Sequence, residues 1–286
     1  MCPYCQSENI AKCGFFKTRS HSVQRFRCRV CVRRFSAQTG TMTYREKKPH
    51  VNQLLFRMLC QGVSQRSCAA LIGIHPITVA RKICRMGLRA RQRLEQESPK
   101  LPDAAIVVFD EMETFEHTKC KPLSIAIAVE EGTRRILAVE VAKMPAKGPL
   151  AAISRRRYGK RKDHRPKALA RMFARIKDVA PNLQEIKSDE SPRYPGPVKG
   201  YLPGVRHTVY KGRRGCVVGQ GELKRGGWDP LFSLNHTCAM LRDHLKRLSR
   251  RTWCTTKRPD RLQLLVDLYA WFHNEMLRGG QRLVRI

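Results

Sequence analysis

Four apolar residues, from Ile106 to Phe109, lead directly into Asp110 in a chain that is otherwise strongly basic. The 286 residues include 57 Lys and Arg against 23 Asp and Glu, a formal net charge of +34. A strand that buries this run would set the Asp110 carboxylate against the interior, which is costly unless a charge such as a divalent metal ion compensates it. A basic protein that holds metal on a carboxylate is typical of enzymes acting on phosphodiesters. The alternative is an exposed acid at a strand end.

Length and composition predict one or two domains with small appendages and enough apolar residues, 42%, for a core. The chain has no apolar run of about eighteen residues and no apolar signal region at its start, so we expect a soluble, cytoplasmic protein without membrane contact. Basic residues recur along the chain and are dense over residues 155–162, which indicates a nucleic-acid partner. An acidic protein or an anionic membrane is the alternative partner.

Two C-x-x-C pairs, Cys2 with Cys5 and Cys28 with Cys31, mark the first domain, residues 1–45. Two such pairs facing each other would bind a structural Zn²⁺ through four thiolates, so we predict a zinc ribbon. Cys13 is left over as a spare or buried thiol. The alternative is two unrelated cysteine pairs.

Residues 46–93 are expected to form a helix-turn-helix DNA-binding domain, with helices over 50–61, 65–72 and 76–86. Ser64 is a candidate N-cap for the second helix, and Gly87 is expected to end the third. The alternative is a small helical bundle with a solvated basic face. Residues 94–102 are predicted to form a linker to the next domain. The third helix is expected to present Thr78, Arg81, Lys82 and Arg85 to DNA and to turn Ile77, Val79, Ile83 and Met86 to the core.

The remaining residues, 103–286, predict an α/β domain of RNase H-like order: three strands, a helix, two strands and a helix. The strands are expected over 104–112, 122–129, 134–142, 183–189 and 205–211, and the helices over 166–180 and 234–250. A later apolar segment, 262–276, would pack on the core or serve a dimer. The predicted fold class is therefore multidomain, with a mixed sheet flanked by helices.

This order places Asp110 on the first strand and Asp189 at the end of its neighbour, where both would bind two Mg²⁺ or Mn²⁺ ions. A cap before Pro192 is the alternative role of Asp189. The third ligand should come from the last helix, where Asn235 offers an amide oxygen, and Arg242 would hold a phosphate. Other candidates for the third ligand are His236, Glu222 and Asp229, and the alternative role of Asn235 is a helix N-cap.

The chain resembles bacterial insertion-sequence transposases, and is most similar to the IS-one family. The resemblance implies catalytic positions at Asp110 and Asp189, and it places the family's catalytic Glu on Asn235. Related families use an Asp-Asp-Asn set with a basic residue further along the helix, which Arg242 would match. The motifs that carry the resemblance are Cys2 to Cys5, residues 24–28 with Cys31, residues 62–82, Asp110 to Met112, Ser188 and Asp189 with Tyr194, and residues 241–252.

We therefore expect a DNA transposase that binds double-stranded transposon ends and target DNA as a homodimer or higher oligomer. One rival is a catalytically inactive DNA-binding derivative or repressor, which the missing third carboxylate favours. A second rival is a structure-specific nuclease of the same fold, which would cut without joining.

Overall fold

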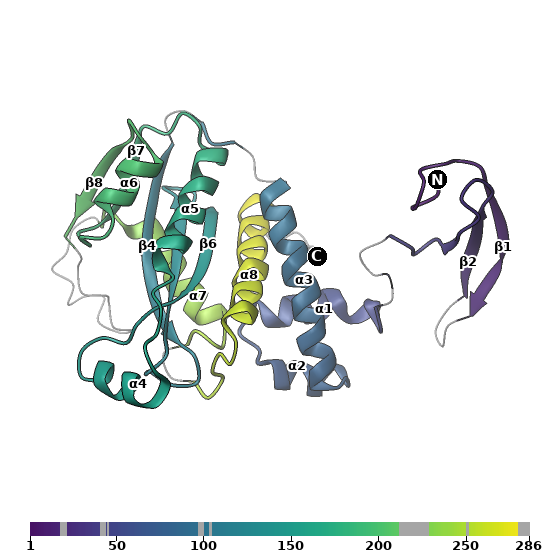
Figure 1. Cartoon of the computed structure of the whole chain (residues 1–286), viewed down its shortest axis with the longest axis horizontal. Helices are drawn as coiled ribbons and strands as arrows, with labels where there is room; N and C mark the ends of the chain where they lie inside the picture. The colour runs from purple at the N-terminus through teal and green to yellow at the C-terminus, as the bar shows by residue number, and fades with distance from the viewer. Residues whose placement is uncertain are drawn as a thin grey trace. The chain divides into compact units, whose positions relative to one another are not determined.

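The computed structural model describes residues 1–17, 22–40, 44, 46–96, 100–102, 105–211, 229–249 and 252–279 (Figure 1). The chain separates into two compact units, Met1–Asn52 and Gln53–Ile286. The first unit contains a three-stranded antiparallel sheet of β1 (Ile10–Lys17), β2 (Ser22–Cys28) and β3 (Arg34–Ser36), and ends with the short 3-10 helix η1 (Pro49–Val51). Its apolar packing is small: Phe26 stacks on Phe35 with ring centroids 5.5 Å apart. Because this unit buries little apolar surface, a bound metal ion would contribute a large share of its folding free energy.

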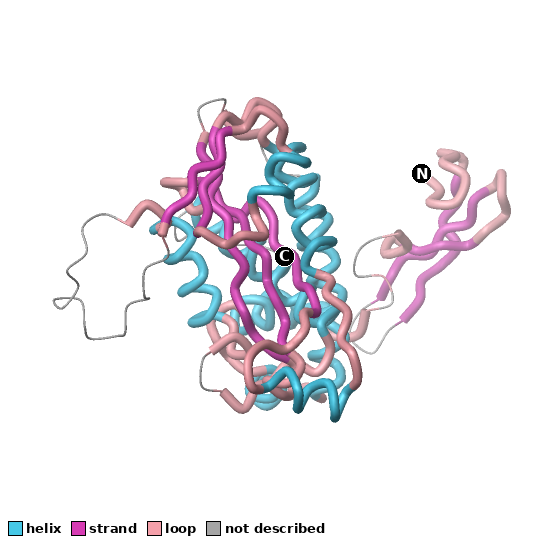
Figure 2. The backbone as a smooth tube through the Cα atoms, turned by 60° about the vertical axis from the view of Figure 1, so that its left-hand side comes forward, coloured by secondary structure: helices cyan, strands magenta, loops and turns pink. Residues whose placement is uncertain are grey.

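A mixed five-stranded sheet forms the centre of the second unit (Figure 2). Its strands are β4 (Ile106–Phe115), β5 (Pro122–Glu130), β6 (Ile136–Lys143), β7 (Glu185–Asp189) and β8 (Arg206–Tyr210). They lie in the order β6-β5-β4-β7-β8; β4 to β6 are antiparallel neighbours, and β7 and β8 run parallel to β4. All five predicted strands are present, with ends shifted by up to three residues.

Helices pack on the two faces of this sheet. Phe109 of β4 meets Phe173 of α5 (Arg165–Val179), with ring centroids 5.2 Å apart. Because successive strand side chains point to opposite faces, Asp110 faces the other side, where α7 (Phe232–His244) contacts β4 and β5. The helix predicted over 234–250 is too long, because α7 ends at His244 and the backbone is extended at Leu245.

Two helices were not predicted from the sequence: α4 (Leu150–Tyr158) and α6 (Pro195–Tyr201). The seven residues of α6 include two prolines and two glycines, which normally indicate a turn. Arginine residues dominate the second half of α4, so it has little apolar periodicity to reveal it.

The predicted helix-turn-helix segment contains α1 (Asn52–Leu59), α2 (Gln65–Ile72) and α3 (Pro76–Gln96). Ser64 is the N-cap of α2, as predicted, because its hydroxyl accepts from the backbone N–H of Ser67 at 3.1 Å. Gly73 ends α2 with a left-handed φ of 68°, so the predicted turn lies between α2 and α3.

The prediction that Gly87 ends the third helix is wrong, because α3 continues to Gln96 and includes the first residues of the predicted linker. Gly87 instead lies where α3 meets α8 (Pro259–Gly279). A Cβ atom at this position would lie 2.4 Å from the carbonyl oxygen of Leu264. The glycine therefore permits close helix packing and does not act as a stop signal.

The packing of α3 also corrects two predicted side-chain directions. Lys82 is buried, with 2% of its surface exposed, whereas Ile77 is 55% exposed. The reason is the helical period: the buried stripe of α3 consists of Val79, Lys82, Ile83, Met86, Gly87 and Ala90.

Side-chain amides of α8 cover the open edge of β6. Asn274 accepts from the backbone N–H of Ile136 at 2.9 Å and donates to the carbonyl of the same residue at 2.8 Å. Gln263 accepts from the N–H of Val141 at 2.6 Å and donates to the carbonyl of Val139 at 2.9 Å. The apolar segment predicted to pack on the core thus does so, against both α3 and β6. None of the described helices is both long and apolar enough to cross a membrane.

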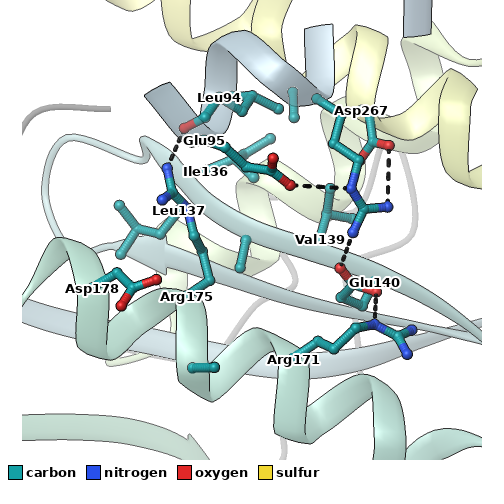
Figure 3. A pocket seen from close by; sticks show the side chains of 14 residues that line it. Leu94, Glu95, Ile136, Leu137, Val139, Glu140, Arg171, Arg175, Asp178 and Asp267 are labelled. Atoms are coloured by element: carbon teal, nitrogen blue, oxygen red, sulfur yellow. Dashed lines mark hydrogen bonds and ion pairs between the residues drawn. The ribbon is translucent and has the colours of Figure 1, made fainter. Parts of the chain in front are cut away.

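A pocket of about 480 Å³ lies where α3, α5, α8 and β6 meet (Figure 3). The Arg91 guanidinium of α3 lies 2.8 Å from Glu140 of β6, 3.3 Å from Glu95 and 3.8 Å from Asp267 of α8. Arg171 of α5 also contacts Glu140, at 2.6 Å. Burial raises the pKa of Asp267 to about 7, despite the nearby Arg91. The ion pairs therefore connect the third predicted helix to the sheet.

Replacement of Gly87 by alanine tests the contact between α3 and α8. Because the new methyl group would collide with the backbone of Leu264, we expect Gly87→Ala to lower the free energy of unfolding by about 1–3 kcal/mol. Equilibrium unfolding in urea would measure the change. The matched control is Gly200→Ala in α6, where a Cβ atom meets no atom within 4 Å. Equal stability of the two variants would contradict the packing described.

Candidate functional site

The four predicted zinc ligands, Cys2, Cys5, Cys28 and Cys31, converge in the first unit. The Sγ atoms of Cys2 and Cys31 lie 3.6 Å apart, as do those of Cys5 and Cys28, and all four lie within 4.8 Å of one another. A tetrahedral zinc with Zn–S bonds of about 2.3 Å would separate its sulfur ligands by roughly 3.8 Å. The four thiols therefore fit a structural zinc ion, and the alternative of two unrelated pairs is excluded.

The two C-x-x-C turns have the same backbone geometry. The N–H of Cys2 donates to the carbonyl of Ser7 at 2.8 Å, and the N–H of Cys28 donates to that of Arg33 at 3.0 Å. Gln6 and Val32, each following the second cysteine of its pair, both have a φ of 61°. A β-branched residue rarely adopts that conformation, so the cluster must compensate its cost at Val32.

The hydrogen bonds of the second turn favour a thiolate. The backbone N–H of Cys31 donates to Sγ of Cys28 at 3.5 Å, and this bond is the main cause that lowers the pKa of Cys28 to about 6. A lowered pKa favours the thiolate form, which is the form that binds metal.

A second candidate site is a pocket of about 170 Å³ in the larger unit, and it contains the predicted acidic residues. It brings together Asp110 of β4, Asp189 at the end of β7, and Asn235 of α7, as predicted. It also contains Asp229, which the sequence offered only as a substitute third ligand. Glu222, the other substitute, lies outside the described residues. The lining residues are Asp110, Asp189, Tyr210, Lys211, Asp229, Pro230, Leu231 and Asn235.

Asp110 is held in a defined orientation. Its Oδ1 accepts a hydrogen bond from the Tyr194 hydroxyl at 2.9 Å and one from the backbone N–H of Glu111 at 2.6 Å. Burial raises the pKa of Asp110, and the nearby charge of Asp189 raises it further. A cation in the pocket would offset both effects. Tyr194 is buried against Phe109, and its hydroxyl contact was missed because no local pattern indicates a partner far along the chain.

Asn235 lies beside Asp229 at the start of α7. Its amide Nδ2 donates to Oδ2 of Asp229 at 2.9 Å, and Oδ1 of Asp229 accepts from the backbone N–H of Leu231 at 3.0 Å. The alternative role of Asn235 as a helix N-cap is wrong, because its own N–H already donates to the carbonyl of Leu231 within the helix. Asp229 instead closes the turn before α7 through the N–H of Leu231, and its other oxygen orients the Asn235 amide.

The oxygen atoms of this pocket suit a hard cation such as Mg²⁺ in their chemistry. Within the described part of the chain, however, only the cysteine cluster brings three or more ligand groups of His, Cys, Asp or Glu within 4.8 Å of one another. The carboxylates of this pocket therefore do not form, by themselves, a group of three ligands placed to hold a metal ion. Mg²⁺ in proteins usually keeps several waters and binds through one or two carboxylates together with substrate phosphates.

Two other predicted residues do not line the pocket. His236 points its ring toward Arg134, with its nitrogen atoms 3.2 and 3.3 Å from that guanidinium. Arg242 lies further along α7, outside the pocket lining, so its phosphate-binding role stays a prediction.

Three of the four α3 residues predicted to contact DNA are accessible, and their role in DNA binding stays a prediction. Arg81 and Arg85 are exposed one turn apart, and Thr78 is half-buried. Lys82 lies on the buried stripe and is removed from this set. The remaining exposed cations project from the same helix that packs on α8.

Comparison with known proteins finds a relative in sequence. The chain is 35% identical over 82 residues to the insertion element iso-IS1N protein InsA of Shigella dysenteriae, a match that covers 29% of this chain and 84% of that protein. No model of a protein family matches the chain.

Among solved structures, the chain aligns with one from the simian T-cell lymphotropic virus intasome in complex with the PP2A regulatory subunit B56 gamma. The alignment covers 82% of this chain and 75% of that one, at 12% identity and a TM-score of 0.32. A likeness this slight carries no argument about fold or function.

Removal of single cysteines tests the metal centre. We expect one zinc ion per chain, and its loss in Cys28→Ala, because three thiolates cannot complete the tetrahedral set. Elemental analysis of the purified protein would measure zinc content. Cys13→Ala, which changes a cysteine outside the cluster, should keep the metal. Full zinc content in Cys28→Ala would contradict the assignment.

Proposed function

We propose that this chain, which belongs to the family of the insertion element protein InsA, is a DNA transposase that cuts and joins strands at its acidic pocket. The family supports a role in transposition and DNA binding. Catalysis is our own inference from the larger unit. It would consist of strand hydrolysis at the element end, followed by transfer of the freed 3′ end to target DNA.

The observation that carries the catalytic proposal is the convergence of Asp110, Asp189, Asp229 and Asn235 in one pocket. These residues come from three places that are distant in sequence: β4, the end of β7 and the start of α7. The sheet order β6-β5-β4-β7-β8 is that expected of an RNase H-like domain, with Asp110 and Asp189 on adjacent parallel strands. Burial raises the pKa of Asp110 and the charge of Asp189 raises it further, and a cationic ligand in the pocket would offset this repulsion.

Each polar group has a proposed task. Tyr194 and the Glu111 N–H fix one oxygen of Asp110, so that the other oxygen is available to a metal ion. Asp229 holds the Asn235 amide nitrogen, which leaves the amide oxygen to serve as a neutral ligand. Two divalent ions bound there would activate the attacking oxygen and stabilise the leaving oxygen. Lys211 at the rim would attract the scissile phosphate, with Arg242 further along α7.

The proposed reaction has two balanced steps. In hydrolysis, a water oxygen bonds to phosphorus and the bond to the 3′-oxygen breaks, which frees a 3′-hydroxyl at the element end. In transfer, that hydroxyl loses its proton and attacks a target phosphodiester, and the target's own 3′-oxygen leaves with a proton. No external energy source is needed, because one phosphodiester replaces another in the second step.

DNA recognition is assigned to both units. The zinc-binding unit and the exposed face of α3, with Arg81, Arg85 and Thr78, would bind the terminal inverted repeats. Because two element ends must be joined to one target, we expect a homodimer or higher oligomer on DNA.

A catalytically inactive DNA-binding protein is the second candidate. The observation that favours it is Asn235, which lies where the resemblance to insertion-sequence transposases expects a Glu and is already hydrogen-bonded to Asp229. Such a protein would bind the element ends and repress, rather than perform, transposition.

A strand-transfer assay on DNA carrying the element ends, with Mg²⁺ or Mn²⁺, separates the two candidates. We expect the wild-type chain to produce joined products and Asp110→Asn and Asp189→Asn to lower the rate at least ~10³-fold, about 4 kcal/mol of barrier. Glu113→Gln is the matched control, since Glu113 lies on the same strand but pairs with Lys147 at an exposed position. Binding of end DNA by the wild type without cleavage would reject the enzyme.

A further inference from the structure

A dense group of exposed cations in the described part of the larger unit lies on α4 and the turn that follows it. This α4 patch consists of Arg155, Arg156, Arg157, Lys160 and Lys162, all exposed. None of the five is part of an ion pair with another residue that the structure describes. The acids around them pair with other cations: Asp163 with Arg165, Glu116 with Arg161, and Glu113 with Lys147.

The patch is built on a rigid support. The hydroxyl of Ser154, on the buried side of α4, donates to the carbonyl of Cys120 at 2.6 Å. Arg161 is anchored below it by Glu116 at 2.6 Å and by the carbonyl of Met144 at 2.9 Å. The Lys121 ammonium lies 4.3 Å from the centre of the Tyr158 ring. The five cations therefore project from a fixed platform, which lowers the entropy lost when they bind a ligand.

The charges are distributed around the helix rather than along one line. Consecutive helical residues are about 100° apart, so Arg155, Arg156 and Arg157 project in three directions around the exposed side of α4. Gly159, with a φ of 72°, then turns the chain and adds Lys160 and Lys162. An arrangement of this kind suits an extended anionic surface better than one small anion in a pocket.

The location of the patch relates it to the acidic pocket and to α3. Strand β4 continues for five residues beyond Asp110, roughly 17 Å along the strand, and the carbonyl of Cys120, in the turn that follows, accepts from Ser154 of α4. In Figure 1, α4 lies at the lower end of the larger unit, the end where α2 and the start of α3 also lie. Strand β4 and the turn after it therefore connect the acidic pocket to the support of the α4 patch.

We propose that the α4 patch binds the phosphate backbone of double-stranded DNA next to the strand that enters the acidic pocket. Contacts to phosphates do not depend on the base sequence, so the patch would bind target DNA as readily as element DNA. The location relative to the pocket rests on the proposed function; the binding of duplex DNA by the patch does not.

The salt dependence of DNA binding tests this surface. The full-length, zinc-loaded protein would be titrated onto a 40-bp duplex of arbitrary sequence at several KCl concentrations, with fluorescence anisotropy as the readout. Each phosphate contact contributes about 0.9 to the slope of log K against log salt, so Arg155→Gln/Arg156→Gln should reduce the slope by about two. Lys177→Gln/Lys199→Gln, which removes the same charge from α5 and α6, should leave it unchanged.

Equal slopes for the patch variant and the charge-matched control would overturn the proposal. Thermal melts of both variants would confirm that folding is intact, as expected for exposed positions. Because the assay needs binding alone, it succeeds or fails independently of strand transfer. A protein that does not cut DNA but shows the slope change would reject the catalytic proposal and keep this one.

Discussion

The larger unit depends on the pairing of α8 with the open edge of β6. An edge strand exposes unpaired backbone N–H and carbonyl groups, and an uncovered edge invites pairing with other chains. Asn274 and Gln263 lie eleven residues apart, so they project from the same side of α8 and reach backbone groups of β6 near both of its ends. Leu264, the residue next to Gln263, packs on α3 at Gly87. One helix therefore joins the predicted DNA-reading helix to the sheet that carries the acids.

The ion pairs around Arg91 reinforce this connection between α3, α8 and the sheet. Arg91 contacts β6 through Glu140 and α8 through Asp267 (Figure 3). Arg171 of α5 contacts Glu140 as well. Removal of one partner from such a network usually destabilises a protein by more than the ion pair contributes to its stability. The reason is that the remaining charge stays desolvated without a partner. The network thus favours one register of α3 against the sheet.

Periodicity and spacing were sufficient to predict the strands, most helices and the zinc ligands. A C-x-x-C pair is local, and alternating or continuous apolar runs reflect burial directly. The errors came from positions where a distant segment decides. Gly87 resembles a helix stop, but it makes room for α8. Lys82 was expected to be exposed, but it lies on the buried stripe of α3. Asp229 and Asn235 could not be separated by pattern, since their mutual hydrogen bond and their approach to Asp110 depend on how α7 packs on β4 and β5.

Metal binding by the acidic pocket is the central claim, and it can be measured without DNA. Fe²⁺ binds oxygen ligands more tightly than Mn²⁺ does, and with ascorbate and peroxide it cuts the backbone beside its ligands. The account predicts cuts near Asp110 and Asp189 that excess Mg²⁺ suppresses and that Asp110→Asn removes. Cleavage at the cysteine cluster alone, with none near Asp110 or Asp189, would contradict it.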